Sequence, residues 1–99
     1  MAKPARITRK IAENLAIQAL GFMAGEPERL GAFLAATGIG PEAIRKAATE
    51  PSFLAGVLDH VCGDELLLIA VAAHAGIAPQ DVEHAQAVLS GRPWRREVS

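Results

Sequence analysis

The sequence predicts an all-α protein: a compact six-helix domain built from two tandem, related three-helix units. Its apolar content is high, at 51%, yet includes only three phenylalanines, one tryptophan and no tyrosine. Glycine and proline separate the apolar runs, as is typical of short helices with defined ends. In addition, residues 13–48 are matched without a gap by residues 51–86, which indicates an internal duplication.

The first unit contains three predicted helices, near residues 8–24, 27–37 and 41–48. The apolar residues expected to face the core from the first helix are Ile11, Leu15, Leu20, Phe22 and Met23. The third helix is short and has Ile44 as its main apolar contact. Such a unit cannot bury much apolar surface alone, so the two units are expected to pack against each other.

The second unit contains predicted helices near residues 51–62, 64–75 and 79–90. In the helix over 51–62, residues spaced three and four apart predict a buried stripe: Phe53, Leu54, Val57, Leu58 and Val61. The helix over 64–75 is apolar nearly all round, which predicts a position at the centre of the bundle. The last helix contributes Val82, Val88 and Leu89.

Glycine and proline mark the helix boundaries in both units. The glycines that follow apolar runs are expected to end helices in the left-handed conformation: Gly25, Gly38, Gly63, Gly76 and Gly91. The prolines that follow are expected in the first turn of the next helix, where a missing N–H costs no hydrogen bond: Pro27, Pro41, Pro51 and Pro79. Glu26 and Asp64 lie beside helix starts, where an acid suits the positive end of the helix dipole.

Charge is distributed unevenly along a single predicted domain, residues 1–91, and a basic tail, residues 92–99, that is expected to be flexible. Residues 1–10 contain four basic side chains and no acidic one, and the tail contains three basic and one acidic. The chain between them contains three basic and ten acidic side chains. An acidic body with two basic ends could bind anionic partners at the ends, although termini are often charged simply because they are solvated.

Cysteine usage and hydropathy favour a cytoplasmic protein. Cys62 is the single cysteine, so no internal disulfide can form, and this fits a reducing compartment. The longest apolar run, residues 66–73, is too short to span a membrane. Polar residues also interrupt the stretch near the N-terminus that a secretory signal would need to keep apolar.

The stretch ENLAIQALGFMAGEPERLGAFLAATGIGPEAIRKAA, residues 13–48, resembles a bacterial family of short all-helical proteins classed as a domain of unknown function. The resemblance extends over most of residues 10–90. It rests on three motifs, which are LGFMAG at 20–25, FLAATG at 33–38 and AGIAP at 75–79. It implies a helical fold, but it brings no activity, ligand or catalytic residue.

Two segments also resemble the corner of a DNA-binding helix-turn-helix. The required spacing of small, glycine and branched apolar residues is matched by Ala72, Gly76, Ile77 and Val82. The copy at 34–46 has Leu34 in place of the small residue, but it offers Arg45 and Lys46 for phosphate contacts. Acidic side chains in the helix after Gly76 oppose phosphate binding, and any tight helical corner shows the same spacing.

The segment DHVCGDE, residues 59–65, brings metal-ligand residue types close together in sequence. His60 and Cys62 lie about 200° apart around a helix, so they cannot easily share a metal ion. Neither zinc-binding spacing nor a nucleophile elbow nor a phosphate-binding glycine loop occurs. Cys62 is therefore expected to be a buried structural thiol, and no enzyme activity, metal or cofactor is predicted.

The function favoured by these patterns is non-catalytic: a small interaction or adaptor module that offers a surface between its two halves to an unidentified protein partner. The candidate contact residues are basic, with the single tryptophan among them: Arg6, Arg9, Lys10, Arg45, Lys46, Trp94, Arg95 and Arg96. Trp94 could anchor a partner or pack over the bundle. The alternative is a nucleic-acid-binding regulator that uses the corner at 34–46 and the basic N-terminal arm. A homodimer is also compatible with an apolar strip left uncovered.

Overall fold

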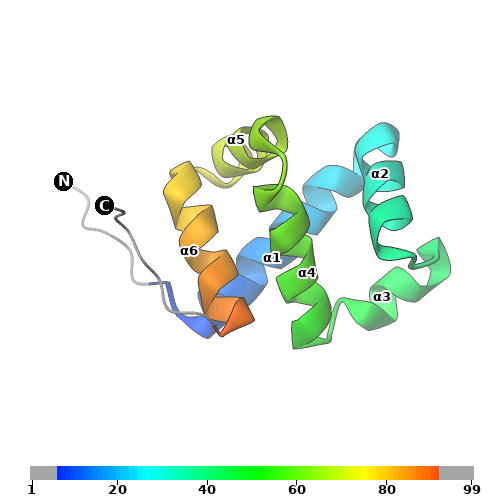
Figure 1. Ribbon diagram of the computed structural model, residues 1–99, viewed down its shortest axis with the longest axis horizontal. Helices are drawn as coiled ribbons and strands as arrows, with labels where there is room; N and C mark the ends of the chain where they lie inside the picture. The colour runs from blue at the N-terminus through cyan, green and yellow to red at the C-terminus, as the bar shows by residue number, and fades with distance from the viewer. Residues whose placement is uncertain (1–6, 92–99) are drawn as a thin grey trace.

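The computed structural model of the chain describes residues 7–91 (Figure 1). Its helices are α1 (Arg9–Ala24), α2 (Pro27–Thr37), the 3-10 turn η1 (Pro41–Ala43), α3 (Ile44–Ala47), α4 (Pro51–Cys62), α5 (Glu65–Ala75) and α6 (Pro79–Ser90). The predicted all-α fold of six helices is confirmed, and the described residues contain no strand. The third predicted helix differs most, because it begins as a 3-10 turn and continues for only four residues.

Two helix starts are capped by side chains that accept hydrogen bonds from the first turn. The Thr8 hydroxyl accepts from the Ile11 N–H at 3.1 Å, at the start of α1. Asp64 Oδ1 accepts from the N–H groups of Leu66 and Leu67 at 3.1 and 3.2 Å, at the start of α5. These bonds satisfy backbone donors that have no partner within the helix, which explains why the helices start at these residues.

The glycines end helices in two different ways. Gly38, Gly76 and Gly91 adopt the predicted left-handed conformation, with φ near 75°. The same prediction is wrong for Gly25 and Gly63, whose φ angles are −80° and −82°. At these two positions the glycine stays right-handed and the next residue becomes extended, which turns the chain directly into the following helix.

Substitution of alanine at Gly76 is expected to destabilise the protein by about 1–2 kcal/mol, because an L-residue is strained at positive φ. A Cβ added there meets no atom within 4 Å, so the cost comes from the backbone alone. Gly63→Ala is the matched control: its Cβ would lie 3.4 Å from the Asp59 carbonyl, at an ordinary φ. Urea unfolding of both variants tests this, and equal losses of stability would contradict the assignment of left-handed strain to Gly76.

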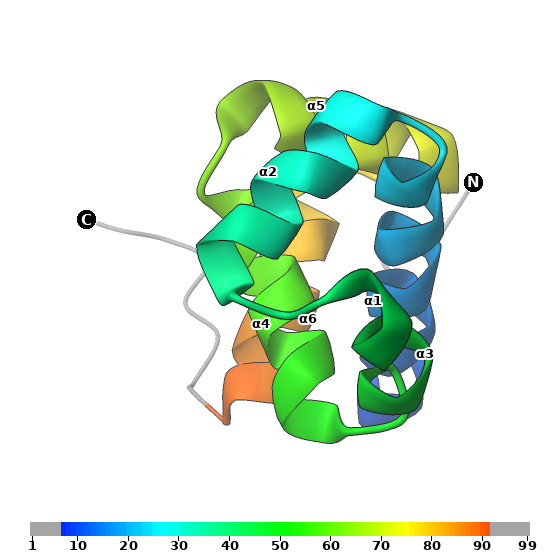
Figure 2. The same cartoon turned by 90° about the vertical axis from the view of Figure 1, so that its right-hand side faces the viewer.

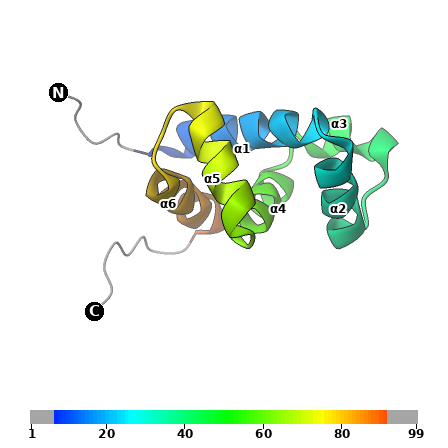
Figure 3. The same cartoon turned by 90° about the horizontal axis from the view of Figure 1, so that it is seen from above.

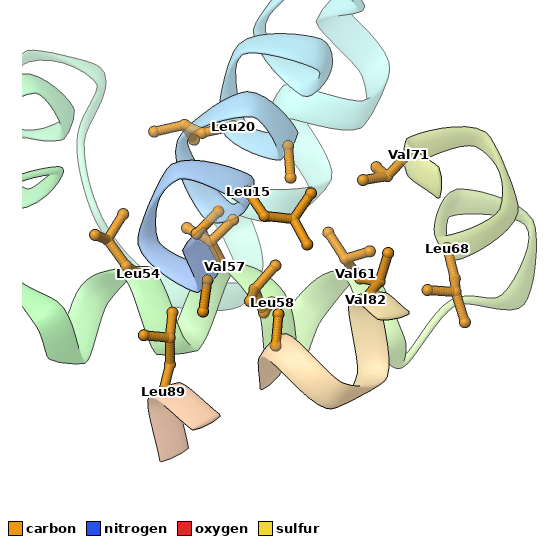
Figure 4. Close-up of a cluster of buried hydrophobic side chains, with 14 of the residues drawn as sticks. Leu15, Leu20, Leu54, Val57, Leu58, Val61, Leu68, Val71, Val82 and Leu89 are labelled. Carbon is orange, nitrogen blue, oxygen red and sulfur yellow. The ribbon is translucent and has the colours of Figure 1, made fainter. Parts of the chain in front are cut away.

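The core forms where α1, α4 and α6 pack against one another, and Figure 4 shows their leucine and valine side chains meeting. The predicted stripe of α4 is confirmed: Leu54, Val57, Leu58 and Val61 are buried and Phe53 is half-buried. The prediction that α5 lies at the centre is wrong. This helix packs one side against α4, α6 and α1 and leaves the other side exposed.

Both α1 and α6 contribute alanines to the buried core. Ala12, Ala16 and Ala19 of α1 are fully buried, and so is Ala85 of α6. Small side chains bring helix axes close together, because interaxial distance depends on the residues at the contact. The scarcity of aromatic residues therefore reflects a core filled by aliphatic side chains between closely packed helices.

Helices α2 and α3 lie together at one end of the long axis of the molecule, whereas α5 and α6 lie toward the other end (Figures 1 and 3). Viewed along this axis, α2 and α3 lie in front of α1 and α4 (Figure 2). Phe33 joins α2 to α4, because its fully buried ring contacts the rings of Phe53 and His60 at centroid distances of 5.8 and 5.2 Å.

The two predicted three-helix units have similar backbone conformations at their glycines. The third helix of each unit, α3 in the first and α6 in the second, packs differently. Gly25 matches Gly63, and Gly38 matches Gly76, in backbone conformation. However, α6 packs extensively on α4, whereas its counterpart α3 makes little contact with α1. A superposable pair of three-helix units is therefore not confirmed, and the duplication stays a prediction from sequence.

Candidate functional site

The basic residues predicted from the sequence to contact a partner do not lie together on the described part of the structure. Arg45 and Lys46 are exposed on α3, while Arg9 and Lys10 are exposed at the start of α1, toward the other end of the molecule (Figure 1). Arg9 also pairs with Glu13, with 3.5 Å between guanidinium and carboxylate. The remaining candidates lie outside the described residues: Arg6, Trp94, Arg95 and Arg96. Their roles in binding stay predictions.

The two helix-turn-helix-like corners differ in structure. At the second corner, the axes of α5 and α6 differ in direction by 99°, and Ala72 and Val82 are buried. This angle suits the motif, but α6 packs on α4 and α1 and exposes Glu83. At the corner over 34–46, the second helix is the four-residue α3. The nucleic-acid alternative thus has Arg45 and Lys46 exposed but no long helix to present them, and it stays a prediction.

The cysteine lies at the end of α4, and two of the histidines pack against phenylalanine rings. Cys62 is half-buried rather than fully buried, at the end of α4. His60 packs against Phe33, and the His74 ring lies 5.1 Å from the ring of Phe22. No group of three or more histidine, cysteine, aspartate or glutamate side chains within residues 7–91 could hold a metal ion.

The outward face of α5 is the first surface that the sequence analysis did not identify. Leu66, Ile69, Ala70 and Ala73 fall within an arc of about 100° around the helix. Leu66 is 74% exposed and Ile69 is 48% exposed. The opposite side of α5 buries Leu67, Leu68, Val71 and Ala72. We call the four outward residues the α5 face; none of them carries a charge.

A signal for this face was present in the sequence. A helix that is apolar all round must either be enclosed by other helices or expose one apolar side. The sequence favoured enclosure, but α1, α4 and α6 fill the centre and leave α5 at the periphery. Contiguous apolar patches on a protein surface often mark interaction sites.

A groove between the first half of the chain and the second is the other candidate site. Its volume is about 250 Å³. One wall is formed by Ile7, two positions before α1, and by four residues of α1: Ile11, Asn14, Leu15 and Gln18. The other wall is formed by the corner that joins α5 to α6: Ala75, Ile77 and Asp81. We call it the α1–corner groove; its lining comes from both halves of the chain.

The corner wall of the groove is held in place by backbone hydrogen bonds. The left-handed Gly76 ends α5 at the corner before α6, and the Ile77 N–H donates to the Ala72 carbonyl at 3.0 Å. Asp81 Oδ2 then accepts from the Ala78 N–H at 3.2 Å, at the start of α6. Ile77 therefore lies in a hydrogen-bonded turn, and Asp81 lies in the first turn of α6.

Comparison with known proteins identifies the family. A family model described as a protein of unknown function, DUF3572, matches residues 9–92. The chain belongs to the DUF3572 family. The match confirms the resemblance inferred from the motifs in residues 13–48 and 75–79, and it spans every helix from α1 to α6. No curated protein and no solved structure matches the chain.

For this DUF3572 chain, no individual helix in residues 7–91 combines the length and the apolar character that a membrane crossing requires. Helices α5 and α6 meet these criteria only when taken together, with the sharp bend between them.

Proposed function

We propose that this DUF3572 protein is a non-catalytic interaction module that binds another protein through the α5 face. The observation that carries the proposal is the 74% exposure of Leu66 within a stripe of four uncharged residues, the α5 face. Leucine in this position contacts water over most of its surface. A partner that covers it gains the free energy of apolar burial, about 25 cal/mol per Å².

The shape of the face favours a helix as the bound element. Successive residues of the α5 face are three, one and three positions apart in the sequence. On a helix this spacing places them in a stripe along one side of α5. An amphipathic helix can lay its own apolar stripe along such a surface, which is a common mode of peptide recognition. This mode of binding involves no reacting group.

Charge indicates which kind of helix fits. Asp64 and Glu65 are exposed at the start of α5, and acidic side chains outnumber basic ones by ten to three over residues 11–91. A partner whose apolar stripe is flanked by lysine or arginine is therefore favoured over an acidic one, chiefly through faster association and selectivity.

Affinity capture with matched variants tests this function. Ile69→Glu places a charge on the α5 face, and Ile17→Glu places the same charge on α1 at a residue that is equally exposed, at 48%. A partner retained by the unmodified protein is expected to be retained by Ile17→Glu and reduced at least about tenfold with Ile69→Glu. Thermal unfolding of each variant checks that the fold is intact.

The proposal is contradicted if the proteins recovered with Ile69→Glu match those recovered with Ile17→Glu in identity and amount. A second contrary result is a partner whose binding is lost with Arg45→Glu and Lys46→Glu but kept with Ile69→Glu. That result would move the contact to α3, where the sequence placed it.

A further inference from the structure

We propose that the α1–corner groove binds a small molecule with a short aliphatic chain and a positively charged amine. This site is separate from the α5 face, so the inference does not depend on the proposed function. Nothing in the family description assigns a ligand.

The walls of the groove select an aliphatic body. Ile7, Ile11 and Leu15 on one side face Ala75 and Ile77 on the other, and all five side chains are aliphatic. Ile11 is 43% exposed, so an apolar ligand that covers it removes apolar surface from water. No aromatic ring lines the groove among the described residues, which favours a flexible alkyl chain over a flat ring system.

The size of the groove limits the ligand. A volume of about 250 Å³ is just below the range of about 300–1,000 Å³ that is usual for drug-sized ligands. A short chain with a single polar head is of a size that fits this space.

The charge of the groove selects the head group. Asp81 is the one charged side chain among the described lining residues. One carboxylate oxygen accepts from the Ala78 N–H, and a carboxylate has capacity for further donors. An ammonium group can donate to it in a charge-assisted hydrogen bond, whereas a ligand carboxylate would be repelled.

The remaining polar groups of the groove accommodate either kind of head. Asn14 and Gln18 lie one helical turn apart on α1 and line the same wall. Their amides can donate and accept hydrogen bonds, so they orient a polar head without distinguishing an amine from an alcohol. Selectivity for a cation therefore depends on Asp81 alone.

Three ligands with the same alkyl chain test the assignment: n-pentylammonium, n-pentanol and pentanoate, titrated into the full-length ¹⁵N-labelled chain at constant ionic strength. Pentylammonium is expected to shift the amide signals of Ile11, Gln18 and Ile77 in a saturable manner. Its affinity is expected to exceed that of pentanoate at least about tenfold, as one charge-assisted hydrogen bond allows. Equal affinities of the two ions, or no saturable shift at these amides, would overturn the proposal.

A pair of variants separates the groove from the general acidity of the protein. Asp81→Asn retains an amide oxygen that can accept from Ala78, so the start of α6 is preserved. This variant is expected to weaken pentylammonium binding about fivefold and to leave pentanol binding unchanged. Glu83→Gln removes a carboxylate from an exposed position of the same helix, outside the groove, and is expected to change neither affinity.

Equal weakening by Asp81→Asn and Glu83→Gln would overturn the site, because it would show nonspecific attraction of a cation to an acidic surface. A blocked lysine, Nα-acetyl-lysine methylamide, provides the last comparison. Binding of this compound more tightly than pentylammonium would also overturn the assignment, since it would identify the lysine side chain of a protein as the occupant. If Asp81→Asn proves unfolded, the three-ligand comparison on the unmodified chain still decides the question.

Discussion

Replacement of Phe33 by alanine is expected to lower the free energy of unfolding by about 3–5 kcal/mol, which is the usual cost of deleting a buried phenylalanine side chain. Phe33 is fully buried although most of α2 is exposed. Its ring fills the space beside Phe53 and His60 of α4. Loss of the ring leaves a cavity and removes the one fully buried side chain of α2.

Phe53→Ala is the control for this prediction. Phe53 is half-buried and belongs to α4, which has many other buried contacts, so its loss is expected to cost less than that of Phe33. Urea unfolding measures the stability of both variants. Hydrogen exchange in the Phe33→Ala protein is expected to accelerate first in α2, because that helix loses its anchor. A smaller cost for Phe33→Ala than for Phe53→Ala would contradict the role assigned to Phe33.

Replacement of Leu58 by alanine is expected to destabilise the protein by about 2–5 kcal/mol. Leu58 is fully buried in α4, among side chains from α1 and α6 (Figure 4). A domain of this size has a total stability of about 5–15 kcal/mol, so the variant is expected to be unfolded in part at physiological temperature.

Leu66→Ala provides the matched comparison, because it removes the same atoms from a leucine that is 74% exposed. Its effect on stability is expected to stay within about 0.5 kcal/mol, as for most surface substitutions. The comparison uses urea unfolding of the isolated protein. A large loss of stability with Leu66→Ala would show that the α5 face is already covered in the free protein, and it would count against its proposed role in binding.

The candidate sites illustrate how much of function can be inferred from a sequence like this one. The sequence predicted basic residues as partner contacts, because the charge of a side chain is known from the sequence without knowing which residues lie beside it. Leu66 and Ile69 were predicted to be buried but are exposed. The sequence of a helix that is apolar on all sides does not show whether its second side packs against other helices or is exposed to water. The groove was not predicted, because Ile11 and Asp81, which line it together, are 70 positions apart in the sequence.

What the amino-acid sequence determined by itself is the number, order and ends of the helices. Those features depend on local interactions: the missing N–H of proline, the capping carboxylate of Asp64 and the φ freedom of Gly38 and Gly76. Membership of the DUF3572 family was likewise readable from short motifs. Each of these depends on residues within a few positions of one another.

What only the tertiary structure decided is which helices share the centre and which surfaces remain open. The packing of α1, α4 and α6 against one another leaves α5 at the periphery, and α3 makes little contact with α1. Such an outcome depends on competition among all helices for the same apolar partners. The spacing of apolar residues shows which side of a helix is apolar. It does not show which of these apolar sides will be covered by neighbouring helices and which will stay exposed.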